Sequence, residues 1–224
     1  YFQVARNHTP TQAGLLMLPL IVGNLIGATG TGQYITRTGR WKGIMLVGSV
    51  SLVAGLTLMG TIDHLTPMWH LSIFMLLMGL GTGALMQNLV LVVQNTVDVT
   101  DVGAASGVVT FFRSLGGTVG VAALGAVLAS NVAGKIASGM SKAGLPVSGD
   151  GGSGSLDLDN LPPAVATIVR TAYADATGRI FLIAGVIAVL TFVAVALMPV
   201  TELRTTIRKV EEKVPEQVLE DVLV

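Results

Sequence analysis

The chain has 224 residues, of which 12% are charged and 51% are hydrophobic, and its 13 basic and 13 acidic residues cancel. An ordinary soluble domain carries about 25% charged residues, so this composition, with a mean hydropathy of +0.73, excludes that class. The zero net charge offers no basic surface for nucleic acid, and the lack of cysteine excludes a disulfide scaffold and a thiolate metal site.

Long stretches with almost no charge divide the chain. A helix needs about 20 apolar residues to cross a hydrocarbon core about 30 Å thick, and lipid offers no partners to the backbone of an open strand. We therefore predict an all-α polytopic membrane protein with five transmembrane helices. They lie near residues 11–35, 43–62, 68–97, 104–129 and 179–199. Because the chain begins with Tyr1 rather than Met, we expect a piece of a longer protein.

The basic residues predict the orientation of these spans. The short connection after the first span carries Arg37, Arg40 and Lys42, whereas residues 63–67 carry no lysine or arginine. The positive-inside rule then places the first connection and the tail, residues 204–224, which begins with Arg204, Arg208, Lys209 and Lys213, in the cytoplasm beneath the plasma membrane. Residues 1–10, 63–67 and 131–178 are expected on the outer side.

The long outer connection, residues 131–178, has three predicted parts. Residues 131–145 continue the fourth span as a helix, and residues 146–159 form a flexible segment rich in Gly, Ser and Asp. A short amphipathic helix follows Pro162 and Pro163. We expect this helix to pack its apolar stripe on the bundle or at the membrane interface, rather than to bind a partner. The stripe consists of Val165, Ile168, Val169, Ala172, Tyr173 and Ala176.

Glycines recur four residues apart inside the spans. This spacing lets helix backbones approach closely, which matters in lipid because the hydrophobic drive between helices is weak. Tight packing is the simpler interpretation, and seams along which helices slide during transport are the alternative. The pairs are Gly23 and Gly27, Gly79 and Gly83, Gly103 and Gly107, and Gly116 and Gly120, with Gly117 beside the last pair.

Amide side chains inside the spans are candidates for a cavity wall. Asn24 lies near the middle of the first span, and Gln87, Asn88 and Gln94 lie toward the cytoplasmic half of the third. Intramembrane amides need partners, so they either join helices by hydrogen bonds or line a substrate pathway. The sequence leaves both interpretations open.

Arg113 is the single charge inside the fourth span. An arginine in hydrocarbon is costly unless it faces protein or water, which makes it a functional candidate. No carboxylate lies inside any of the five spans, so its partner would be a backbone carbonyl, Gln87 or Gln94, Asp98 or Asp101, or an acid elsewhere in the protein. The alternative is a structural arginine that caps helix ends at the inner face.

The sequence contains no pattern typical of catalysis or cofactor binding. His8, His64 and His70 are too dispersed for a metal site, and no nucleophile elbow or phosphate-binding lysine loop occurs. We expect no enzyme, no metal and no cofactor.

Three motifs give the chain a family resemblance. Tyr1-Phe2-Gln3-Val4 and Thr9-Pro10-Thr11-Gln12-Ala13-Gly14-Leu15 resemble the outer connection and helix start of the fourteen-helix drug:proton antiporters of the major facilitator superfamily. The loop Gly32-Gln33-Tyr34-Ile35-Thr36-Arg37-Thr38-Gly39-Arg40-Trp41-Lys42 resembles that superfamily's cytoplasmic signature G-x-x-x-D-R-x-G-R-[RK]. Here Thr36 replaces the aspartate and Trp41 is inserted before the second cation. A third run is similar to the one that enters that family's penultimate helix: Gln94-Asn95, then Asp101-x-Gly103-x-Ala105-Ser106, then Phe112-Arg113-x-Leu115-Gly116-Gly117-x3-Val121.

The resemblance implies a role for residues 1–203. They would form most of the C-terminal bundle of such a transporter, partnered by lipid, a small-molecule substrate, protons and a missing N-terminal bundle. Asn24, Gln87, Asn88, Gln94 and Arg113 would line the cavity or gate, while the cations of the 32–42 loop would anchor the inner gate on helix C-termini or anionic lipid. The coupling carboxylate would lie outside these spans. Two alternatives stay open: a five-span membrane scaffold that transports nothing, and the same fold exporting a native metabolite.

Overall fold

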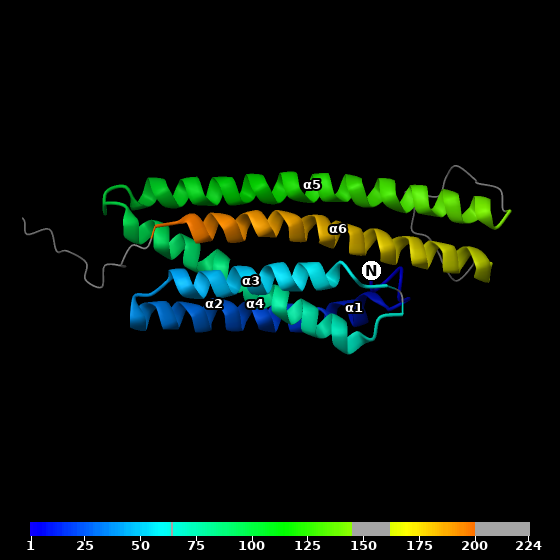
Figure 1. The fold of residues 1–224 in the computed structure, drawn as a ribbon, viewed down its shortest axis with the longest axis horizontal. Helices are drawn as coiled ribbons and strands as arrows, with labels where there is room; N and C mark the ends of the chain where they lie inside the picture. Colours follow the sequence, from blue (N-terminus) through cyan, green and yellow to red (C-terminus); the bar gives the residue numbers. More distant parts are fainter. Residues whose placement is uncertain (64, 145–161, 200–224) are drawn as a thin grey trace, which may run out of the picture.

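The computed structural model describes residues 1–63, 65–144 and 162–199, which form six α-helices (Figure 1). No strand occurs within these ranges. Five helical segments, with α1 and α2 taken together, are long and apolar enough to cross a membrane, as predicted. The predicted flexible segment 146–159 and the tail 204–224 lie outside the described residues. The helices are α1 (Pro10–Leu16), α2 (Leu18–Thr38), α3 (Lys42–Met59), α4 (Met68–Thr96), α5 (Val102–Lys142) and α6 (Pro163–Leu197).

The first predicted span is interrupted at Met17, which separates α1 from α2. Pro19 stands in the first turn of α2, where its missing N–H and its ring prevent a regular bond to the preceding turn. At the start of α1, Thr9 and Gln12 form a reciprocal capping box. The single helix predicted for residues 11–35 is therefore two helices, because the proline breaks the hydrogen-bond ladder.

Helix α4 lies at the centre of the bundle. It packs along α2 on one side and along α3 on another, and α3 in turn packs against α6. Helix α5 packs mainly against α6 and has only a small contact with α4. Figure 1 shows α5 and α6 side by side at one edge of the structure. Most of the surface of α5 is consequently uncovered.

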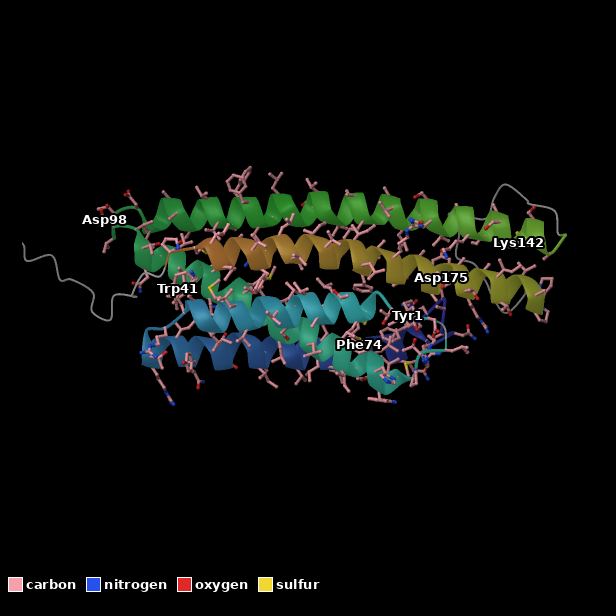
Figure 2. All side chains as sticks on the ribbon, in the orientation of Figure 1. Tyr1, Trp41, Phe74, Asp98, Lys142 and Asp175 are labelled. Carbon is pink, nitrogen blue, oxygen red and sulfur yellow. The ribbon has the colours of Figure 1, made fainter. Side chains whose placement is uncertain are left out.

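The two ends of the bundle have separate apolar cores. Figure 2 shows Trp41 and Asp98 at one end, called here the Trp41 end, and Tyr1, Lys142 and Asp175 toward the other, called the Tyr1 end. Trp41 is only 2% exposed, and a bulky side chain so buried joins its connection firmly to the helices around it. Its cluster comprises Ile35, Trp41, Met45, Leu85, Val92 and Val195. The cluster at the Tyr1 end comprises Phe2, Ala13, Met59, Ile62, Leu71 and Met75.

Helices α5 and α6 extend beyond the other helices at the Tyr1 end (Figure 1). At 1.5 Å per residue, the 41 residues of α5 measure about 61 Å and the 35 residues of α6 about 52 Å. Residues 131–142 belong to α5, as predicted for the continuation of the fourth span. The helix expected after Pro163 is not a separate short one, because Pro163 begins the same helix that continues as the last span.

The extensions of α5 and α6 pack against each other through an apolar core. The apolar stripe predicted after Pro163 contacts α5 in this core. Lys135 Nζ lies 2.6 Å from Asp175 Oδ2, and Arg179 donates to Asn131 Oδ1 at 3.1 Å. The stripe therefore packs within a helical hairpin and not flat on the bundle. The buried residues of this apolar core are Val132 and Ile136 from α5 and Val169, Ala172 and Ala176 from α6.

Candidate functional site

A groove lies between α2 and α4 in the half nearer the Trp41 end. Its volume is about 500 Å³, within the range of small-molecule sites. Both helices contribute polar side chains in a part of the sequence that is otherwise apolar. We call it the amide groove, and its lining includes Thr29, Gly32, Gln33, Thr36, Arg37, Gln87, Asn88 and Leu91.

Asn88 forms the floor of the amide groove and is fully buried. Its Nδ2 donates to the carbonyl of Ala84 at 2.6 Å and to Thr31 Oγ1 at 2.5 Å, while Thr31 donates to the carbonyl of Gly27. Both amide hydrogens are thus used, and Oδ1 is buried without a hydrogen bond from the described residues. A buried acceptor of this kind favours a donor from a water or a ligand in the groove.

A second polar contact joins α2 and α4 nearer the Tyr1 end. Asn24 Nδ2 donates to Thr82 Oγ1 at 3.1 Å, and Thr82 donates back to its own helix at Met78 and Gly79. Asn24 itself is largely exposed. It therefore contacts a neighbouring helix and also faces outward, so both interpretations given for it from the sequence are compatible with its position.

Four glycines allow α2 and α4 to approach this closely. A Cβ on Gly23 or Gly27 would lie within 3.0 Å of the carbonyl of Leu76 or Leu80 on α4. Conversely, a Cβ on Gly79 or Gly83 would collide with the carbonyl of Leu20 or Asn24 on α2. The contact is reciprocal and backbone to backbone, which brings Asn88 within reach of Thr31.

The expected packing glycines of α5 have a different environment. Gly103, Gly107, Gly116, Gly117 and Gly120 have no atom of another element within 4 Å of the position of a Cβ. The reason is that α5 contacts chiefly α6, and these glycines lie away from that contact. Within the described residues they pack against nothing.

Gln94 and Arg113 lie outside the amide groove. Gln94 Nε2 donates to Ser106 Oγ at 2.9 Å, which links α4 to α5. Arg113 is exposed on α5 and borders a different cavity. Among the described residues it forms no hydrogen bond or ion pair, so the partners expected for it in Gln87, Gln94, Asp98 and Asp101 are not its partners here. Of the five candidates, only Gln87 and Asn88 thus share the amide groove, and the other three lie elsewhere.

The connection between α2 and α3 contains the predicted cationic motif. Gly39 ends α2 with φ of 67°, a conformation that glycine adopts without strain. Arg37 and Arg40 are exposed. Lys42 Nζ donates to the carbonyl oxygen of Met198 at 2.6 Å, a contact with a helix C-terminus of the kind expected for this loop.

Sequence reasoning missed four residues that support these contacts. Trp41 is a core residue rather than an insertion in a polar loop, and Ser106 is the partner of Gln94. Thr31 and Thr82 stand four and three residues after the packing glycines Gly27 and Gly79. A hydroxyl one turn beyond a packing glycine faces the same neighbouring helix. This spacing could therefore have identified Thr31 and Thr82 from the sequence.

No group of three or more histidine, aspartate or glutamate side chains within the described ranges is placed to hold a metal ion. The polar groups of the amide groove are amides, hydroxyls and the guanidinium of Arg37, in a membrane-spanning helical bundle. These features define a polytopic membrane protein with a polar groove of small-molecule size.

Comparison with known proteins identifies the class. Residues 1–138 match the family model of the Major Facilitator Superfamily, and the chain belongs to this family of transporters. An uncharacterized MFS-type transporter of Mycobacterium tuberculosis is 34% identical over 196 residues, which cover 86% of this chain and 28% of that protein. The membership agrees with the resemblance found in the sequence.

Two further relatives have names that refer to resistance or efflux. The tetracycline resistance determinant of Streptomyces rimosus is 31% identical over 61% of this chain and 40% of its own length. Efflux pump dotC of Dothistroma septosporum is 28% identical over 92% of this chain and 36% of its own length. The chain thus spans well under half of the relatives it matches. These names favour a transporter over a non-transporting scaffold.

Proposed function

We propose that this chain is most of the C-terminal bundle of a multidrug exporter that exchanges small molecules for protons by alternating access. The amide groove carries the proposal. It places Gln87, Asn88 and Gln33 together on an open side of spanning helices, with an acceptor on Asn88 free to receive a donor. Polar groups in such positions are expensive in lipid and usually belong to a transport pathway.

The proposed partner of this chain is an N-terminal bundle supplied by the rest of the protein. Two relatives are between two and three times as long as the segment that aligns with this chain, which supports this expectation. The uncovered face of α5 supports it as well, since open glycines there leave room for another helix. Rocking of the two bundles about the groove would expose it to each side in turn.

We place the protein in the plasma membrane. In the proposed orientation, the Trp41 end faces the cytoplasm. Arg37, Arg40 and Lys42 lie in the short connection at that end, whereas the short connection at the other end, residues 63–67, has no lysine or arginine, which is the asymmetry the positive-inside rule reads. The tail that follows α6 would then be cytoplasmic. Fusing a reporter that is active only in the cytoplasm to the C-terminus tests this placement, and an inactive fusion contradicts it.

Proton coupling needs a titratable group within the membrane. The described parts of the five spans contain no carboxylate, since Asp175 lies in the extension of α6 and Asp98 and Asp101 lie between α4 and α5. We therefore place the coupling carboxylate in the remainder of the protein. Replacing each carboxylate of the full protein with its amide tests this, and finding Asp98 or Asp101 to be the only acids needed would refute it.

Efflux of fluorescent dyes from energised cells tests the transport proposal. The full-length protein, expressed in a strain without its own major exporters, should lower the accumulation of ethidium and of neutral N-phenyl-naphthylamine, and a protonophore should abolish the effect. Gln87→Leu should reduce the initial rate about tenfold or more, on the scale of one lost hydrogen bond to a ligand.

A matched control is Gln3→Leu, the same change at an exposed position before α1. It should leave the efflux rate unchanged. Accumulation equal to that of cells without the protein, for every dye tested, would contradict the proposed function.

A further inference from the structure

A second cavity lies among α3, α4, α5 and α6, apart from the amide groove. Its volume is about 470 Å³, enough for a ligand of two or three aromatic rings. We call it the Arg113 crevice. Its lining includes Met45, Leu85, Leu89, Phe112, Arg113 and Val195.

The lining of the Arg113 crevice is almost entirely apolar. Apart from Arg113, the single polar side chain among the described lining residues is Thr191, and no acidic residue is among them. The loose contact between α4 and α5 leaves the space open. An apolar cavity therefore has one positive charge at its edge.

The charge of Arg113 has no partner among the described residues. A guanidinium at the level of a membrane costs several kcal/mol unless it is paired or solvated. Its planar fork of donors fits two oxygens of a carboxylate or sulfonate. An anion held there would offset the cost of the cation, whereas a cationic ligand would add to it.

We propose that the Arg113 crevice binds lipophilic organic anions, with an aromatic body among the apolar side chains and an acidic group on the guanidinium. This assigns a substrate class to the exporter and to that extent rests on the proposed function. Binding itself does not require transport, so the two can be tested separately.

Two fluorescent probes form a matched pair for this test. Anilinonaphthalene sulfonate carries a sulfonate on the same aromatic body that N-phenyl-naphthylamine has without one. Trp41 reports on the crevice, because it packs with Met45 and Val195, two of the lining residues. The full-length protein in nanodiscs of zwitterionic lipid is titrated with each probe. The fluorescence energy transfer that comes from Trp41 is obtained by subtracting the signal of Trp41→Phe from that of the unaltered protein.

In the unaltered protein, the sulfonate should bind about tenfold or more tightly than the neutral probe after correction for partition into lipid, as expected for a charge-assisted contact. Arg113→Gln should remove that preference and leave the affinity of the neutral probe within about twofold. Arg113→Lys should keep part of the preference, since it retains the charge without the fork. Arg179→Gln, an arginine change at the other end of the bundle, should alter neither affinity.

Three outcomes would overturn the inference. They are equal affinities of the two probes for the unaltered protein, a sulfonate preference that survives Arg113→Gln, and a transfer signal independent of Trp41. The first uses no variant and is therefore unaffected by misfolding. An acid from the rest of the protein that occupies Arg113 would also give equal affinities. In each case efflux of neutral dyes would persist, which separates this failure from a failure of the proposed function.

Discussion

Lys42 Nζ and the carbonyl oxygen of Met198 are joined by a hydrogen bond of 2.6 Å between residues 156 positions apart in the chain. The bond connects the first residue of α3 to the residue that caps α6. The last carbonyls of a helix lack partners within the helix and carry its negative dipole end, so a lysine is well suited to them. The connection between α2 and α3 is in this way hydrogen-bonded to the end of α6.

Replacement of Lys42 should loosen the end of α6. Lys42→Met keeps most of the side-chain length and removes the charge, with an expected loss of about 1 kcal/mol for the local contact. The amide of Met198 should then exchange with solvent about fivefold faster by hydrogen exchange. Arg40→Met in the same loop is the control, and equal exchange in both variants would exclude the role given to Lys42.

Alanine at the glycine contact between α2 and α4 should destabilise the bundle. Gly83→Ala places a Cβ against the carbonyl of Asn24, and overpacking of this kind costs about 1–3 kcal/mol. Thermal unfolding of the purified full-length protein measures the effect. Gly43→Ala on α3 is the matched control because the space around Gly43 is open, and the same decrease in Tm for both variants would argue against the close contact.

The open glycines of α5 test whether another part of the protein covers this helix. Gly117→Leu should lower the stability of the full-length protein by about 1–3 kcal/mol if a helix packs there. Gly134→Leu, in the extension of α5, also has open space around it and should have little effect. A Gly117→Leu protein with unchanged Tm and unchanged efflux would mean that this face is covered by lipid alone.

Asn88 distinguishes a transport role from a packing role. Asn88→Leu removes one hydrogen bond within α4 and one to Thr31 of α2 from a fully buried position, yet an interhelical bond in a membrane averages only about 0.6 kcal/mol. We expect Tm to fall by a few degrees and the efflux rate to fall about tenfold or more.

Ser51→Ala is the control for Asn88→Leu. Ser51 donates to the carbonyl of Leu77 at 2.8 Å and joins α3 to α4 outside the amide groove. This variant should lose similar stability and keep its efflux rate. Parallel losses of stability and efflux in both variants would return Asn88 to a purely structural role.

The hairpin of α5 and α6 should depend on its apolar core more than on its ion pair. Lys135 and Asp175 are 38% and 40% exposed, so Asp175→Asn should cost less than about 1 kcal/mol. Val169 is 2% exposed, and Val169→Ala should cost about 2 kcal/mol. Hydrogen exchange of residues 163–178 measures both, and a larger effect from Asp175→Asn would reverse this ranking.

The fold was largely predictable because lipid imposes strong rules on a sequence. Charge-free stretches predicted all five spans. Glycine spacing predicted close packing at Gly23, Gly27, Gly79 and Gly83, and the structure shows that the partners are α2 and α4. The break at Met17 was missed, because apolar composition alone does not reveal an interruption. The signal was Pro19, which cannot donate the backbone hydrogen bond that a continuous helix needs. The length of α6 was also missed, because Arg179 and Asp175 look like the end of a span although the helix continues past them into an extension.

The candidate site was predicted less completely. The sequence grouped Gln94 and Arg113 with Asn88 as candidates for one cavity wall, and the structure places these two outside the amide groove. Residues seven apart share a helix face, but that spacing does not reveal which neighbouring helix the face meets. Thr31 and Thr82 became visible only as partners of Asn88 and Asn24.

The sequence by itself determined the membrane class, the number of spans and the family, because these follow from hydropathy, charge position and local motifs along one chain. Only the tertiary structure decided which glycines touch another backbone and which lie open. It also decided that Trp41 is a core residue and that Arg113 borders a separate apolar cavity without a partner among the described residues. Such properties depend on the relative placement of helices, which is set by side chains far apart in the sequence.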